Sequence, residues 1–192
     1  LSFSIKKIFS GFFLIISFVR LPVPGPTSNT SSFLFIFPIL LGRDLLKKGK
    51  PDIELIKLMK RAGFTDFSLP VESGNSRILK RWCSNKWDIN NTDMEGLIKA
   101  FNDVGIRIDA NYMIGFPDET RDEIDTTIEY AKRNAELGVD TSCFFICIPL
   151  PGTEMFDYCI DNGLIEGDVE IDRMNLRSAN MINTIVPPEE LE

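Results

Sequence analysis

The sequence predicts an α/β fold built on parallel strands with helices outside them, and three observations carry this prediction. Strand-like runs begin near residues 66, 107 and 140, which is about the spacing of successive βα units. Segments with apolar residues three and four positions apart lie between these runs, and glycines follow the longer segments. Three or four parallel strands are too few to close a barrel, so we expect part of a larger fold rather than a small open sheet.

The helices are predicted by their caps and their apolar periodicity. Asp52 caps a helix over 53–64 that carries one apolar stripe, and Gly63 supplies the left-handed stop. Further helices are expected at 77–82, from Thr92 or Asp93 to 101 with Gly105 after it, from Asp118 or Thr120 to 135, and at 153–160.

The strands are predicted from short runs of β-branched, aromatic and aliphatic residues. These runs cover 66–71, 107–114 and 140–148. The last of them, DTSCFFICI, has the composition of a buried strand.

Composition divides the chain near residue 50. Of the formal net charge of −7, the first fifty residues contribute seven basic and one acidic side chain, and nearly all acidic residues follow. We therefore expect an atypical apolar segment over 1–50, a catalytic-type α/β unit over 51–165, and the start of a C-terminal extension over 166–192. The closing residues VPPEELE resemble a first helical turn, so both ends are expected to be truncated.

The apolar runs 8–19 and 33–41 allow several interpretations. Both are shorter than the roughly 20 residues that span a bilayer. Lys6 and Lys7 before the first run resemble a secretory signal, but no small-residue cleavage site follows. A membrane-surface anchor over 8–19 is a further alternative, and we favour a stretch that is not native to the domain. The expected location is the cytoplasm.

The residue inventory excludes several chemistries. The chain has no histidine, which removes Ser-His-Asp and Cys-His nucleophile systems and His-ligated zinc or haem. Four cysteines in 192 residues are too few for a disulfide framework, so a reducing compartment is expected. The acidic balance, with a sequence pI near 4.8, gives no nucleic-acid surface.

Three strand ends are followed by residues that suit a ligand site. In parallel α/β folds ligands bind at the carboxyl ends of the strands. The three loops read ESGNS after the first strand, GFPDET after the second and PLPGTE after the third. Each loop alone is ordinary turn chemistry, but its recurrence on three consecutive strands favours a site for an amphiphilic ligand.

These strings carry a family resemblance. LPVESGNSRILKRW, NYMIGFPDET followed by EIDTTIEYAK, and FFICIPLPGTEMFD followed by DNGLI resemble the second half of the radical S-adenosylmethionine (SAM) barrel. The resemblance is to the group of MiaB-like methylthiotransferases and the elongator catalytic subunit, and to its cobalamin-binding branch. It covers about residues 51–165 and implies a partial (β/α)6 TIM-like barrel, with SAM lying across the strand ends on a 4Fe-4S cluster.

The resemblance also implies which residues contact SAM. The first loop would line its amino-acid or ribose side, Asn111 would contact the ribose, the second loop would approach the adenosine, and the third would contact adenine. Glu119 belongs to the second motif, where its role is either cofactor binding or stabilisation of a helix N-terminus. The implied cofactor-binding residues are Glu72, Ser73, Gly74, Lys86, Asn111, Ile114, Gly115, Phe116, Glu119, Leu150, Pro151 and Gly152.

One departure from the family concerns the cluster. The cluster loop Cys-x3-Cys-x2-Cys is absent from residues 1–50, so the chain is expected to be inactive by itself. Cys143 and Cys147 have the first spacing, but position 150 is Leu150, and we expect both to be core residues. The resemblance implies that the parent enzyme would use an electron donor such as flavodoxin or ferredoxin and an unknown substrate, and the cobalamin-binding branch implies a cobalamin domain upstream. The alternative is a non-catalytic SAM-binding or scaffold protein without the cluster.

Overall fold

The computed structural model of the chain describes residues 18–20, 33–35, 45–84, 88–165 and 180–191. Lys86, most of the apolar run 8–19 and most of the extension expected over 166–192 lie outside the described residues. Among the helices that are described, none combines the length and the apolar character needed to cross a membrane.

A parallel sheet of three strands forms the centre of the described structure. Its strands are β5 (Asp66–Glu72), β6 (Arg107–Ile114) and β7 (Thr141–Ile146), in the order β5-β6-β7. All neighbouring pairs are parallel, and each connection contains at least one helix. The predicted α/β fold class with a parallel sheet is confirmed, and sequential neighbouring strands are the arrangement of a (β/α) barrel.

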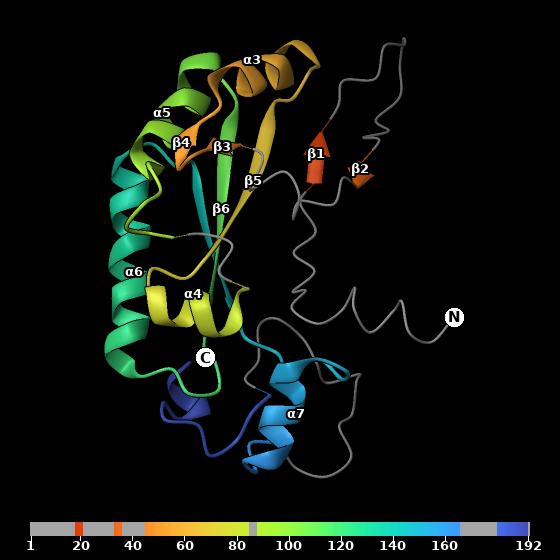
Figure 1. The fold of residues 1–192 in the computed structure, drawn as a ribbon, viewed down its shortest axis with the longest axis vertical. Helices are drawn as coiled ribbons and strands as arrows, with labels where there is room; N and C mark the ends of the chain where they lie inside the picture. The colour runs from red at the N-terminus through yellow and green to blue at the C-terminus, as the bar shows by residue number, and fades with distance from the viewer. Residues whose placement is uncertain (1–17, 21–32, 36–44, 85–87, 166–179, 192) are drawn as a thin grey trace.

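Helices cover the sheet and its lower end, as Figure 1 shows. The helices α5 and α6 run beside the strands, while α3 lies at one end of the sheet and α7 at the opposite end. The helices are α3 (Ile53–Arg61), α4 (Ser76–Trp82), α5 (Met94–Val104), α6 (Arg121–Glu136), α7 (Glu154–Asp161) and the 3-10 turn η2 (Pro188–Glu190).

The structure shows which of the candidate capping residues stands at the start of each helix. Asp52 caps α3 by accepting from the Leu55 N–H, as predicted. Asp93 rather than Thr92 caps α5, and Thr120 rather than Asp118 stands at the start of α6. Asp118 is left outside the helix, and its carboxylate takes a different role at the strand ends.

Two small antiparallel pairs were not predicted from the sequence. β1 (Phe18–Arg20) pairs with β2 (Phe33–Phe35), and β3 (Leu46–Lys47) pairs with β4 (Lys50–Pro51). Lys48 and Gly49 connect β3 to β4, both with positive φ, as a two-residue hairpin turn requires. The Gly49 carbonyl accepts from the Asp93 N–H at 2.8 Å, which fixes the hairpin to the start of α5.

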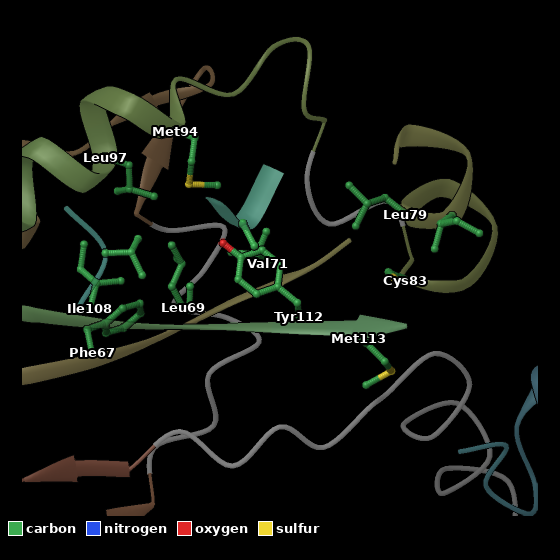
Figure 2. Close-up of a cluster of buried hydrophobic side chains, with 14 of the residues drawn as sticks. Phe67, Leu69, Val71, Leu79, Cys83, Met94, Leu97, Ile108, Tyr112 and Met113 are labelled. Atoms are coloured by element: carbon green, nitrogen blue, oxygen red, sulfur yellow. The ribbon is translucent and has the colours of Figure 1, made fainter. Parts of the chain in front are cut away.

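The core lies between the sheet and the helices. Phe67 of β5 stacks on Phe101 of α5 with ring centroids 5.0 Å apart, and the Tyr112 hydroxyl accepts from Asn134 of α6. In Figure 2, Tyr112 and Met113 extend from opposite faces of β6, as side chains of a strand alternate. The core between the sheet and the helices is therefore largely apolar, and the Tyr112 hydroxyl is hydrogen-bonded within it.

The prediction of a buried strand over 140–148 is wrong for its first half. Thr141 and Ser142 are exposed, and Phe144 keeps 39% of its surface exposed although it stacks on Tyr112. The reason is that β7 is the last strand in the order β5-β6-β7, so within the described part of the chain it has a partner on one side only. Burial begins at Ile146, where the strand reaches the loops at the carboxyl edge.

Candidate functional site

The candidate site is the edge of the sheet where β5, β6 and β7 end. The loop from residue 73 to 75 joins β5 to α4, the loop 115–120 joins β6 to α6, and the loop 147–153 joins β7 to α7. Because the strands are parallel, all three loops leave the sheet at the same edge. We call them the first, second and third strand-end loops.

The first strand-end loop follows Glu72, whose backbone conformation is strained. Glu72 is buried and has a φ of +67°, in the left-handed region that a residue with a side chain rarely adopts. Its position follows a register irregularity of β5, because Pro70 pairs with Asn111 and Glu72 pairs with Tyr112, so that Val71 is extra. Proline has no N–H to give to a ladder, which suits a bulge. Strain of this kind is frequent at binding sites.

The rest of the first loop is fixed to α6. The Ser73 hydroxyl lies 3.0 Å from the Thr127 hydroxyl, and the Gly74 N–H donates to the same Thr127 oxygen at 3.1 Å. A Cβ on Gly74 would lie 2.6 Å from the Cβ of Tyr130, also on α6. Gly74 is therefore required by the close approach of the loop to α6, which is a role other than the predicted contact with SAM.

The second strand-end loop is organised by Glu119. Its Oε2 accepts from the Gly115 N–H at 2.7 Å and from the Phe116 N–H at 3.1 Å. Its Oε1 is buried and has no hydrogen-bond partner among the described residues. Burial raises the pKa of Glu119 to about 7, although the two N–H groups favour the charged form. The Glu119 carboxylate therefore fixes the conformation of the second loop through Oε2, while Oε1 accepts no hydrogen bond from the described residues.

At Gly115, a side chain in place of the hydrogen would come into close contact with another residue of the chain. Its φ is +77°, and an added Cβ would lie 2.7 Å from the Cδ1 of Leu191. Phe116 is also buried, whereas Ile114 keeps part of its surface accessible. Asn111, three residues before the end of β6, is 6% exposed and donates to the Ser68 hydroxyl at 2.6 Å. The part of this loop open to a ligand is thus smaller than the sequence suggests.

The third strand-end loop is the most open of the three. Leu150 is 37% exposed, Pro151 and Gly152 are exposed, and a Cβ on Gly152 would meet nothing within 4 Å. The Leu150 carbonyl accepts from both the N–H and the hydroxyl of Thr153, which caps α7. An apolar side chain and a bare glycine are therefore available to a flat ring at this edge, while that carbonyl is already bonded.

The sequence analysis missed an ion-pair network at this edge. Arg77 of α4 donates to both carboxylate oxygens of Glu123, to the Asp118 carboxylate at 2.9 Å and to the Asp118 carbonyl at 2.8 Å. The other Asp118 oxygen accepts from the Trp82 indole N–H at 2.6 Å. The residue types were visible, but the partners are 36 to 46 positions apart in the sequence, so no spacing pattern pointed to them.

The cysteines of the described part do not form a metal centre. Cys147 is fully buried just past β7, with its thiol 3.4 Å from the Met155 sulfur, and Cys159 contacts the Met181 sulfur. Burial raises the pKa of Cys147 well above its usual range, and the neighbouring Cys83 thiol raises it further. Within the described residues no three His, Cys, Asp or Glu side chains are grouped so that they could hold a metal ion.

The fold and the edge define the described part of the chain as an α/β unit with a parallel sheet and a candidate ligand site at the carboxyl ends of its strands. No family model matches the chain. It is 34% identical over 112 residues to an uncharacterised methyltransferase of Pyrococcus horikoshii, covering 58% of this chain and 23% of that protein.

Two further relatives have named activities. The chain is 27% identical over 132 residues to cytidylyl-2-hydroxyethylphosphonate methyltransferase of Streptomyces wedmorensis, covering 66% of this chain and 24% of that protein. It is 33% identical over 91 residues to tRNA-2-methylthio-N(6)-dimethylallyladenosine synthase of Clostridium tetani, covering 46% and 19%. The chain thus spans about a quarter or less of the length of these relatives.

Among solved structures, the chain is similar to coproporphyrinogen III oxidase (HemN) of Escherichia coli, described there as a radical SAM enzyme. The TM-score is 0.44 at 21% identity, over 52% of this chain and 22% of that one. The methylthio-adenosine synthases among the sequence relatives confirm the predicted resemblance to the methylthiotransferase group. The assignment of single residues to a cofactor stays a prediction.

Proposed function

We propose that this chain supplies the SAM-orienting and substrate-facing half of a radical SAM enzyme of the methyltransferase and methylthiotransferase group. The observation that carries the proposal is the match to these enzymes over 112 and 132 residues, which the three loops at one edge of the parallel sheet support. The matched segment is about a quarter or less of each relative's length, so the complete activity is proposed for a parent enzyme and not for these residues alone.

In this proposal each of the three strand ends, with its loop, contacts a different part of the SAM molecule. The third loop, with Leu150 exposed beside the bare Gly152, suits the adenine ring, because an apolar side chain and open space favour a flat group. Ile114, which keeps part of its surface accessible, suits the adenosine, and a ribose contact with Asn111 would require its amide to leave the Ser68 hydroxyl. Glu72, buried at the end of β5, suits the amino-acid side, where a carboxylate attracts an ammonium group.

The 4Fe-4S cluster is not assigned to the described residues. In a radical SAM parent the cluster supplies the electron that cleaves SAM to a 5'-deoxyadenosyl radical. The described cysteines do not fit it, because Cys147 and Cys159 are turned to methionine sulfurs in the core. We therefore assign no step of cluster chemistry to this part of the chain. The cluster ligands, a flavodoxin or ferredoxin electron donor and a cobalamin domain are proposed for the rest of the parent.

The proposal is tested by titrating the 192-residue chain with SAM in an isothermal calorimeter. Leu150→Ser should weaken SAM binding by about fivefold to tenfold, because it removes an apolar contact at the adenine. Leu58→Ser is the matched control, since Leu58 is also exposed but lies on α3 at the other end of the sheet. Its SAM affinity should equal that of the unchanged chain.

Two outcomes would contradict the proposal in different ways. If the chain binds no SAM, or if Leu58→Ser weakens binding as much as Leu150→Ser, the SAM site is not at the third loop. If SAM binds as proposed but the chain stays inactive when it is joined to the cluster-bearing half of a relative, the non-catalytic SAM-binding or scaffold protein becomes the better description.

A further inference from the structure

The ion-pair network of Arg77 joins two of the three strand-end loops. Arg77 lies in the first turn of α4, directly after the first loop, whose Asn75 caps that helix. Its guanidinium reaches Asp118, in the second loop, and Glu123, in the first turn of α6. One side chain therefore fixes the start of α4 to the loop and the helix that follow the neighbouring strand.

The geometry of the network restricts both partners. The two carboxylate oxygens of Glu123 accept from Nε and one terminal nitrogen of Arg77, in the paired fashion typical of arginine and carboxylate. Glu123 also accepts from the N–H and the hydroxyl of Thr120, the residue that ends the second loop. Each group in the chain Arg77, Glu123, Thr120 is thus held by more than one hydrogen bond.

Asp118 accepts hydrogen bonds from two residues of α4. Its Oδ2 and its carbonyl accept from Arg77, and its Oδ1 accepts from the indole of Trp82. Trp82 is buried, so it offers a fixed donor, whereas Arg77 is 46% exposed. The pairing with Arg77 lowers the pKa of Glu123 to about 2, so the Glu123 carboxylate stays charged throughout the neutral range.

The network lies outside the residues that would touch a ligand. Glu119, which shapes the second loop through the Gly115 and Phe116 N–H groups, is flanked in sequence by Asp118 and Thr120. Holding these two neighbours holds Glu119 in place as well. The first loop is fixed to α6 separately, through Ser73, Gly74 and Thr127.

We propose that Arg77 is a positioning residue that sets the second strand-end loop relative to the first, so that both loops present their ligand contacts together. The positioning follows from the network itself, and its consequence for SAM rests on the function proposed above. Arg77 touches no ligand in this proposal and acts through Asp118, Glu123 and Glu119.

The test compares Arg77 with a neighbour on the same helix. Arg77→Gln removes the network, and Arg77→Lys keeps the charge without the paired hydrogen bonds. Arg81→Gln is the matched control: Arg81 pairs with Glu154 at 3.0 Å and its guanidinium lies over the Trp82 ring at 4.3 Å, but within the described residues it makes no hydrogen bond or ion pair with the second loop. Hydrogen exchange of the Gly115 and Phe116 amides and SAM affinity are measured on the 192-residue chain.

We expect Arg77→Gln to speed exchange of both amides by about tenfold and to weaken SAM binding by about tenfold. Arg77→Lys should recover only part of either effect, and Arg81→Gln should change neither by more than about twofold. If Arg77→Gln does not fold, Asp118→Asn, which weakens the same network, is measured in its place with the same expectation at smaller size.

The two readouts separate this proposal from the proposed function. Unchanged amide exchange in Arg77→Gln, or equal effects of Arg77→Gln and Arg81→Gln, overturns the positioning role. Full recovery by Arg77→Lys also overturns it, because charge alone would then be sufficient. If the unchanged chain binds no SAM, the proposed function fails, and the exchange data alone decide whether Arg77 positions the loop.

Discussion

Gly74→Ala measures how tightly the first strand-end loop is packed on α6. The added Cβ would lie 2.6 Å from the Cβ of Tyr130, 3.0 Å from the carbonyl oxygen of Thr126 and 3.0 Å from the Cα of Thr127. None of these atoms is the end of a flexible side chain, so the loop itself has to move. Overpacking of this kind costs about 1–3 kcal/mol, and loss of the Gly74 to Thr127 hydrogen bond adds about 1 kcal/mol.

The assay is urea unfolding of the 192-residue chain followed by circular dichroism. We expect Gly74→Ala to lower the free energy of unfolding by about 2–4 kcal/mol with an unchanged denaturant slope. Gly152→Ala is the control, because its Cβ meets nothing within 4 Å and its φ of +85° leaves backbone strain of about 1–2 kcal/mol as the cost. A smaller loss for Gly74→Ala than for Gly152→Ala would refute the argument that close packing on α6 requires this glycine.

Three further predictions follow from the same structure. Glu119 has a pKa raised from 4.5 to about 7 in the folded chain, so its contribution to stability is complete below pH 4.5 and is lost as the pH rises to about 7. The loss is on the order of 3 kcal/mol, and Glu119→Gln should remove this part of the pH dependence measured by unfolding; an unchanged profile would contradict the buried-carboxylate assignment. Gly115→Ala should destabilise the chain through both its backbone and its 2.7 Å approach to Leu191, and adding Leu191→Ala should recover the steric part only, which a double-mutant cycle measures; additive losses would show that the two side chains do not meet. Cys147→Ala should lower the free energy of unfolding by about 1–2 kcal/mol, because the thiol is fully buried. When the chain is joined to the cluster-bearing half of a relative and reconstituted, this variant should bind as much iron as the unchanged protein, as measured by mass spectrometry; lost iron in a folded variant would reverse the core assignment.

The fold was predictable where local signals agree with one another. The strand Arg107–Ile114 matches its predicted bounds, because Gly105 and Gly115 flank a run that begins with alternating polar and apolar residues. The α6 start was ambiguous between Asp118 and Thr120, since both are good cap residues. Tertiary contacts decide it, because Asp118 is bound by Trp82 and Arg77 instead of by its own helix.

The position of the candidate site was predictable from the sequence, but the contacts within the site were not. Parallel strand order alone brings the three loops to one edge, so their position needed only the βα spacing. What a glycine makes room for depends on residues far away in the sequence. Gly74 faces α6 and Gly115 faces Leu191, and no spacing in the sequence shows either neighbour.

The irregularity in β5 affects how this chain is aligned with its relatives. Val71 and Glu72 together occupy the length of sheet that Tyr112 occupies on β6, so the strand carries one more residue than its ladder needs. A relative that lacks the bulge would show a one-residue gap at this point. Such a gap changes the aim of the carboxylate at the strand end, and an alignment that moves it into the following loop would match Glu72 with the wrong residue.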